Sequence, residues 1–73
     1  MHEEQQRVTK KLTRREHQVL VGVAGGLVTA QIAQQLSIRE RTVDSHIANL
    51  MRKLSCNTRS QAVARAFRAG ILK

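Results

Sequence analysis

The sequence predicts a small all-α domain, a four-helix bundle that occupies residues 12–73. Three observations support this fold class. Apolar residues recur at helical spacing in four segments of the chain. Residues that favour helix caps (Thr13, Thr29, and Thr58 or Ser60) precede three of these segments, and glycines follow two of them. A chain of 73 residues is long enough for one domain at most.

The first helix is expected over residues 14–24. Thr13 and Glu16 form a capping-box pattern, in which each side chain satisfies a backbone amide that the helix leaves unpaired. Three apolar residues form its buried stripe: Val19, Leu20 and Val23. Gly22 either weakens this helix by about 1 kcal/mol relative to alanine or marks a close helix contact. The pair at 25–26 ends the helix, because a glycine readily takes the left-handed conformation.

The second helix is expected over residues 30–36, with Thr29 as its cap and Ile32, Ala33 and Leu36 facing inward. It spans only about two turns, so it depends on tertiary packing. A connection of three or four residues leads to a longer helix over 40–54. Two short helices followed by a tight turn and a longer helix with an outward basic face indicate a helix-turn-helix.

The third helix, residues 40–54, is expected to carry the functional surface. Ser37 and Glu40 form a second capping-box pattern, which would start this helix slightly early. Its apolar stripe consists of Val43, Ile47, Leu50, Met51 and Leu54. Its opposite face consists of Arg41, Ser45, Ala48, Asn49 and Arg52. Such a helix fits the major groove of DNA, although an ordinary surface helix has the same pattern.

The fourth helix follows Thr58 or Ser60 as its cap, runs to Ala69 and ends at Gly70. Two apolar residues are expected in the core: Val63 and Phe67. Three small residues form a flank at helical spacing: Ala62, Ala66 and Ala69. This flank is either a seam for pairing with a second copy of the chain or a merely alanine-rich surface.

Charge points to a polyanionic partner. Thirteen lysines and arginines against five acidic residues give a formal charge of +8. From Arg39 onward there are eight basic and two acidic residues, so the excess lies mainly in the half that contains the third helix. A field of this strength in so small a domain favours nucleic acid. Phe67 is the only aromatic residue, which argues against modules that stack single-stranded bases.

Enzyme and metal functions find little support in the sequence. The acidic residues Glu16, Glu40 and Asp44 form no evident paired-carboxylate site. The histidines and the single cysteine lack metal-ligand spacing: His2, His17, His46 and Cys56. We therefore expect no catalytic residues, no metal and no cofactor.

The remaining features favour the cytoplasm. One cysteine excludes a disulfide framework and fits a reducing compartment. The longest apolar run, residues 19–28, is too short to span a bilayer, so no membrane partner is expected. Residues 1–11 are charged, show no signal-peptide pattern, and are expected to form a flexible arm or linker.

Several short motifs occur in order along residues 12–72. They are Leu12-Thr13-x-Arg15-Glu16, Gly26-Leu27, Ile32-Ala33, Leu36-x-Ile38, Thr42-Val43-x-x-His46, Asn49, Lys53-Leu54, Arg59-x-x-Ala62 and Gly70-Ile71. Together they resemble the DNA-binding domain of the LuxR/FixJ/NarL superfamily. The chain is similar in length to stand-alone, GerE-like members. Most members instead carry the domain as the output part of a response regulator or ligand-binding protein.

The resemblance implies a bacterial transcriptional regulator that binds double-stranded DNA and pairs as a homodimer through the fourth helix. RNA polymerase is a further candidate partner. The expected phosphate contacts are Thr29, Arg39, Arg41, Thr42, Arg52 and Lys53. The side chains that the resemblance places on base edges are Asp44, Ser45 and Ala48. It places Asn49 toward the backbone, and we also expect Asn49 to contribute to base discrimination. The expected dimer interface is Ala62, Ala66 and Ala69.

Four positions depart from the family pattern. Asp44 replaces the usual lysine. This change either alters the preferred DNA sequence or abolishes tight binding. An altered preference is chemically reasonable because a carboxylate can accept a hydrogen bond from cytosine N4. In the second case the chain would be a protein-interaction module. Arg39 replaces a capping serine, and Ala30 replaces a frequent lysine. Ser55 stands where glycine is usual, so a left-handed turn there costs about 1 kcal/mol.

Overall fold

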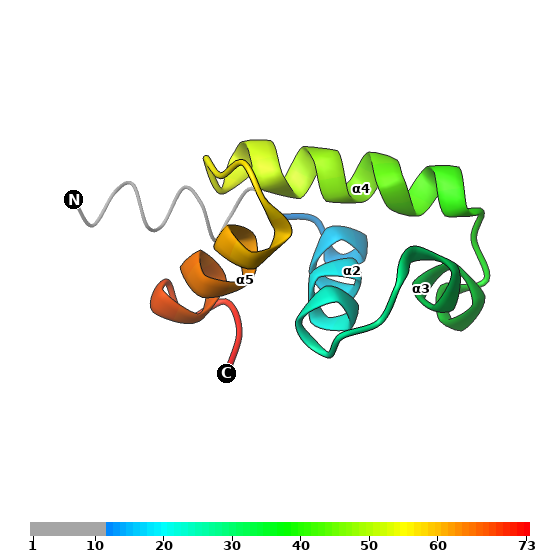
Figure 1. Cartoon of the computed structure of the whole chain (residues 1–73), viewed down its shortest axis with the longest axis horizontal. Coiled ribbons are helices and arrows are strands. Elements are labelled where there is room, and N and C mark those ends of the chain that lie inside the picture. Colours follow the sequence, from blue (N-terminus) through cyan, green and yellow to red (C-terminus); the bar gives the residue numbers. More distant parts are fainter. Residues whose placement is uncertain (1–11) are drawn as a thin grey trace.

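The computed structural model describes residues 12–73, and these form four α-helices (Figure 1). In chain order they are α2 (Arg14–Ala24), α3 (Thr29–Leu36), α4 (Glu40–Lys53) and α5 (Arg59–Arg68). The predicted all-α class and the four helices are confirmed. The expected arm, residues 1–11, lies outside the described residues.

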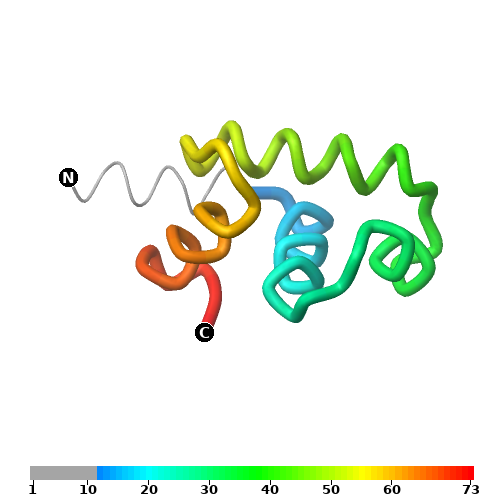
Figure 2. The backbone as a smooth tube through the Cα atoms, in the orientation of Figure 1, coloured from blue at the N-terminus to red at the C-terminus, as the bar shows by residue number. Residues whose placement is uncertain are grey.

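Helix α4 is the longest element, and the other three helices pack against it. Figure 1 shows α4 along the long axis of the molecule, with α2, α3 and α5 on one side of it. The smooth path in Figure 2 makes the short turn between α3 and α4 visible. This turn, residues 37–39, joins the two helices of the predicted helix-turn-helix.

The buried core is built from the apolar stripes of all four helices and the segment after α5. Its members are Val19, Leu20, Ile32, Ala33, Val43, Ile47, Leu50, Leu54, Ala62, Ala66 and Leu72. The predicted α4 stripe therefore faces the core, with Met51 partly buried beside it. No helix within residues 12–73 has the length and apolar character needed to cross a membrane.

The start of α2 is the predicted capping box. The Glu16 amide donates to Thr13 Oγ1 at 3.1 Å, and the Thr13 amide donates to Glu16 Oε1 at 2.9 Å. Gly22 lies at a close contact between helices, which was one of the two roles predicted for it. A Cβ built at Gly22 would lie 2.9 Å from Cγ1 of Ile32, so only glycine lets α2 and α3 approach this closely.

The predicted start of α3 was one residue too late, whereas α4 begins at Glu40 as predicted but without the possible Ser37 capping box. Thr29 is the first residue of α3 and Val28 is its N-cap, with the Val28 amide donating to Gln31 Oε1 at 2.9 Å. Arg39 caps α4 through its extended backbone, without a side-chain hydrogen bond. Ser37 cannot form the second capping box because its backbone is left-handed, with φ of 57°, and it ends α3.

Each helix ends in the same backbone motif, with one left-handed residue just after the last turn. At the end of α4 the Ser55 amide donates to the Arg52 carbonyl at 3.1 Å, and the Cys56 amide donates to the Met51 carbonyl at 3.0 Å. This is the Schellman pattern. Ser55 has a φ of 56°, which confirms the left-handed turn expected there despite the absence of glycine. The residues in this conformation are Gly26, Ser37, Ser55 and Gly70.

Helix α5 matches the predicted core face only in part: Val63 is half-buried against the core as expected, but Phe67 is not. Thr58 is its cap, accepting from the Gln61 amide at 3.1 Å. Phe67, predicted to be buried, is 51% exposed, whereas Ala62 and Ala66 are 1% and 0% exposed. Small side chains let α5 lie close to its neighbours. Leu72 then enters the core, because its amide donates back to the Ala66 carbonyl at 3.1 Å.

Candidate nucleic-acid interface

One strip of exposed side chains runs along the outer face of α4. Its members are Arg41, Asp44, Ser45, Ala48 and Arg52, which we call the α4 strip. Their spacing places them on one side of a helix with 3.6 residues per turn. The core stripe of Val43, Ile47 and Leu50 lies on the opposite side, against the other helices. All five strip residues are exposed, and α2, α3 and α5 lie together on one side of α4 (Figure 1).

The α4 strip has arginines at its ends and small side chains at its centre. Arg41 and Arg52 are eleven residues apart, which corresponds to about 16 Å along the helix axis. The major groove is about 12 Å wide, so the separation of the two arginines is comparable to the width of the groove. Ser45 and Ala48 lie between the arginines, and both are exposed, so the centre of the strip carries no bulky side chain apart from Asp44.

Three further predicted residues flank the strip. Arg52 Nη2 donates to Asn49 Oδ1 at 3.1 Å, so Asn49 orients the arginine at one end of the strip. Arg39 and Thr42 are exposed at the start of α4, where unpaired backbone amides favour anions. The structure thus brings all the predicted α4 residues except Lys53 to one open surface.

Lys53 is engaged inside the protein. Its Nζ lies 2.7 Å from Glu16 Oε1, and the two side chains are 22% and 5% exposed, respectively. Burial raises the pKa of the Glu16 carboxyl. The hydrogen bonds from Lys53 and Thr13, together with the charges of Lys53 and His46, outweigh this, and the pKa ends below its usual value. The ammonium predicted to contact phosphate therefore neutralises a buried carboxylate.

Thr29 lies apart from the α4 strip, at the start of α3, and is half-buried. The side chain of Arg59 reaches it from α5, with Nη2 at 3.5 Å from Thr29 Oγ1. Arg59 was not predicted as a site residue, because only the packing of α5 brings it to this end of α3. The two residues place a positive charge beside the first turn of α3.

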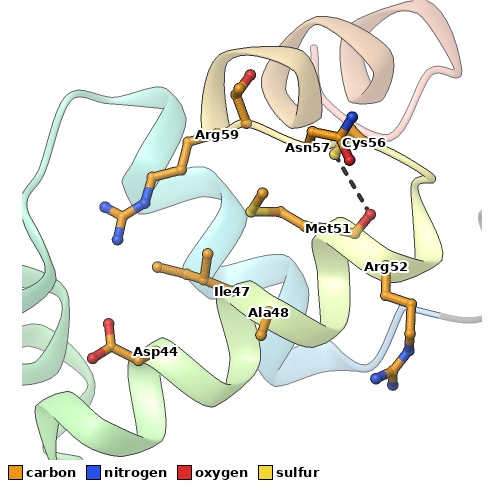
Figure 3. A pocket seen from close by; sticks show the side chains of 9 residues that line it. Asp44, Ile47, Ala48, Met51, Arg52, Cys56, Asn57 and Arg59 are labelled. Carbon is orange, nitrogen blue, oxygen red and sulfur yellow. Dashed lines mark hydrogen bonds between the residues drawn. The ribbon is translucent and has the colours of Figure 1, made fainter.

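A shallow hollow lies between α4 and the start of α5 (Figure 3). Its lining includes Asp44, Ala48 and Arg52 of the strip, together with Arg59 from α5. Cys56 also lines it, with Sγ 3.5 Å from the Met51 carbonyl oxygen. Burial raises the pKa of this thiol, which disfavours the reactive thiolate. Within residues 12–73, no three His, Cys, Asp or Glu side chains are grouped so that they could hold a metal ion.

Two of the three residues predicted for the dimer interface lie in the core of the single chain. Ala62 and Ala66 are almost completely buried in the core of a single chain, so they present no surface to a second copy. Ala69 is half-buried. The apolar surface that α5 leaves exposed is instead centred on Phe67.

Taken together, a short helix, a three-residue turn and a longer helix with an open basic strip define a helix-turn-helix DNA-binding domain. Residues 10–66 match the GerE family model, which describes bacterial regulatory proteins of the luxR family. The chain belongs to this family, as its sequence motifs predicted.

Relatives with known roles agree with this assignment. The chain is 44% identical over 62 residues to the spore germination protein GerE of Bacillus subtilis (strain 168), covering 84% of that protein. It is 43% identical over 61 residues to the transcriptional activator protein AnoR of Acinetobacter nosocomialis, covering 26% of that protein. Coverage of the transcriptional regulatory protein DegU of Brevibacillus brevis is also 26%, at 39% identity. The chain thus spans about a quarter of AnoR and DegU.

The fold has a solved counterpart in full-length FixJ from B. japonicum. The two structures align with a TM-score of 0.77 at 38% sequence identity, over 90% of this chain and 32% of FixJ. These relatives are transcriptional regulators with a LuxR-type helix-turn-helix domain.

Proposed function

We propose that this chain is a sequence-specific, double-stranded DNA-binding transcriptional regulator, or the DNA-binding part of one, that acts in the cytoplasm. Helix α4 enters the major groove. The α4 strip is the observation that carries this proposal, because its arginines are spaced for the two groove walls and its centre is small. The formal charge of +8 supports the same partner. RNA polymerase belongs to the proposal as the machinery on which such a regulator acts.

The contacts divide into two groups. Phosphates are bound by Thr29, Arg39, Arg41, Thr42 and Arg52. Base edges are contacted by Asp44, Ser45, Ala48 and Asn49. Lys53 is removed from the first group because its ammonium neutralises Glu16. It holds α4 in place instead of contacting DNA.

Fluorescence anisotropy of a labelled random duplex, titrated at several salt concentrations, tests the proposal. Each neutralised phosphate contributes about −0.9 to the slope of log affinity against log salt. With Arg39, Arg41 and Arg52 on phosphates, we expect a slope of about −3 per chain. Arg52→Ala is expected to reduce its magnitude by about one unit.

Arg68→Ala is the matched control, since Arg68 is an exposed arginine at the far end of α5. It is expected to leave the salt slope close to that of the unchanged protein. Absence of binding at low salt, or equal losses for the two variants, would show that α4 does not lie against the DNA backbone.

A protein-interaction module is the second candidate function. It is favoured by one observation, the exposed carboxylate of Asp44 on the α4 strip, which repels phosphate. Asp44→Lys discriminates the two functions. If α4 lies in the groove, this change raises affinity for a random duplex. If the strip binds a protein, the variant gains no DNA affinity.

Homodimerisation through α5 is the last part of the proposal. Phe67 is 51% exposed and follows half-buried Val63 by one helical turn, which makes this face the best apolar surface on α5. Two paired copies would place their α4 helices about one DNA turn, roughly 34 Å, apart. Phe67→Gln is expected to abolish cooperative binding to a duplex with two half-sites. Val21→Gln, at an exposed valine of α2, is the control.

A further inference from the structure

Asp44 occupies an unusual place on a surface proposed to meet DNA. It lies one turn from Arg41 on the α4 strip, beside Ser45 and Ala48, and its side chain is exposed. Among residues 12–73, no side chain forms an ion pair or hydrogen bond with its carboxylate. Figure 3 shows Asp44 pointing away from Arg52, the arginine at the other end of the strip. The carboxylate is therefore available to a ligand.

The position of Asp44 between the arginines separates it from the phosphates. Arg41 and Arg52 mark the ends of a strip about 16 Å long, where the groove walls lie. Asp44 lies inside this span, next to the small side chains that let α4 approach the bases. At that position the carboxylate faces base edges. A hydrogen-bond acceptor that is buried there without a donor costs binding free energy.

The four bases offer such an acceptor very different partners in the major groove. Guanine presents two acceptors, N7 and O6, and thymine presents O4 and a methyl group. Adenine presents the N6 donor beside the N7 acceptor, so a carboxylate that approaches N6 also meets a repulsive atom. Cytosine presents the N4 amino donor without a neighbouring acceptor of its own. Cytosine is thus the base that a carboxylate accepts from most favourably.

We propose that Asp44 is a specificity-determining residue that selects a cytosine in each half-site by accepting a hydrogen bond from its N4 amino group. This proposal rests on the proposed DNA-binding function and assigns one base of its target. It also accounts for a negative charge on a basic surface, since the charge contributes selectivity while the arginines contribute affinity.

Selection from a random duplex pool, carried out in parallel with the unchanged protein, Asp44→Ala and Asp44→Asn, tests the assignment. The unchanged protein is expected to enrich a site with one fixed C·G pair per half-site. Asp44→Ala is expected to enrich the same site but to show no base preference at that one position. Asp44→Asn is expected to prefer adenine there, because an amide pairs with adenine N6 and N7.

A second measurement isolates the single amino group. The selected cytosine is replaced by a pyrimidinone analogue that lacks the N4 amino group, and affinity is measured by anisotropy. We expect the unchanged protein to lose about ten-fold in affinity, which lies within the usual range for one base contact. Asp44→Ala is expected to bind both duplexes equally.

The outcomes distinguish a failure of the role of Asp44 from a failure of the proposed DNA-binding function. If the unchanged protein enriches a site and all three proteins select the same bases, the role of Asp44 is overturned while DNA binding stands. An equal loss on the analogue for the unchanged protein and Asp44→Ala also overturns it. If the unchanged protein neither enriches a sequence nor binds the random pool at low salt, the proposed function itself fails.

Discussion

Lys53 Nζ and Glu16 Oε1 lie 2.7 Å apart, and the same carboxylate oxygen accepts the Thr13 amide at 2.9 Å. One buried oxygen therefore joins the end of α4 to the start of α2, across 37 residues of sequence. The contact adds to the packing of the buried α4 stripe in holding α4 against α2. Lys53, outside the proposed DNA-binding strip, thus supports the helix that carries the strip.

Glu16→Gln is expected to lower the free energy of unfolding by about 2 kcal/mol, measured by urea denaturation at neutral pH. Glutamine can still accept the Thr13 amide in the capping box, so the change mainly removes the charge opposite Lys53. Breaking a buried pair leaves one charge without its partner and is usually strongly destabilising. The effect is moderated here because the Lys53 side chain is 22% exposed and can turn towards solvent.

Glu40→Gln supplies the control for this change. Glu40 is an exposed carboxylate in the first turn of α4, and its removal is expected to change stability by no more than about 0.5 kcal/mol. An equal effect of Glu16→Gln and Glu40→Gln would mean that the contact with Lys53 contributes no net stability.

The same carboxyl predicts a loss of stability in acid. The pKa of Glu16 is lower in the folded protein than in the unfolded chain, so the folded state binds this proton less readily. Its stabilising effect is therefore complete above the unfolded pKa, about 4.3, and is lost as the pH falls through the lower folded value. Urea midpoints between pH 7 and about pH 3 check this. The unchanged protein is expected to lose more stability over this range than Glu16→Gln, and parallel curves would refute the assignment.

Local sequence signals predicted most of the fold. The capping box at Thr13 and Glu16 and the glycines at 25–26 give the bounds of α2, because caps and left-handed residues act over a few residues only. The outer face of α4 was likewise predictable, since a helix of 14 residues with one apolar stripe has only one face left for solvent.

Long-range packing contacts could not be predicted from the same local signals. Helix α5 carries apolar side chains on two faces, and hydrophobicity alone favoured the face with Phe67. The structure buries Ala62 and Ala66 instead, because closely packed helices leave no room for a larger side chain. The pairing of Lys53 with Glu16 joins residues far apart in sequence, so a lysine on a basic helix was assigned to DNA.

Gly22→Ala is expected to destabilise the protein by roughly 1–3 kcal/mol, although alanine is the better helix former. The added Cβ would lie 2.9 Å from Cγ1 and 3.1 Å from Cδ1 of Ile32, which is 1% exposed and has little room to move. The clash forces α2 and α3 apart. The thermal midpoint, followed by circular dichroism, measures the effect.

Gly25→Ala is the matched variant at the end of the same helix. A Cβ there would meet its nearest atom, the Val21 carbonyl oxygen, at 3.5 Å, and Gly25 has a φ of −81°. Alanine fits this conformation, so we expect stability to be unchanged or raised by up to about 1 kcal/mol. If the two variants have the same stability, the close approach of Gly22 to Ile32 does not explain a requirement for glycine at position 22.

Arg52 and Lys53 are neighbours in sequence with the same charge, and the structure predicts opposite defects for them. Arg52→Ala is expected to leave the free energy of unfolding within about 0.5 kcal/mol, because its guanidinium is exposed and bonds only Asn49 among the described residues. It is expected to reduce the salt slope of DNA binding by about 0.9. Lys53→Met is expected to lower stability, since it leaves the Glu16 carboxylate buried without its cation.

DNA binding by Lys53→Met is then measured at a temperature where circular dichroism shows the variant folded. Its salt slope is expected to match that of the unchanged protein, because the lysine ammonium lies against Glu16 and adds no phosphate contact. A slope reduced by a full phosphate contact, with stability intact, would instead place Lys53 on the DNA. The pair of variants therefore separates the residue that holds α4 in position from the residue that α4 presents to the groove wall.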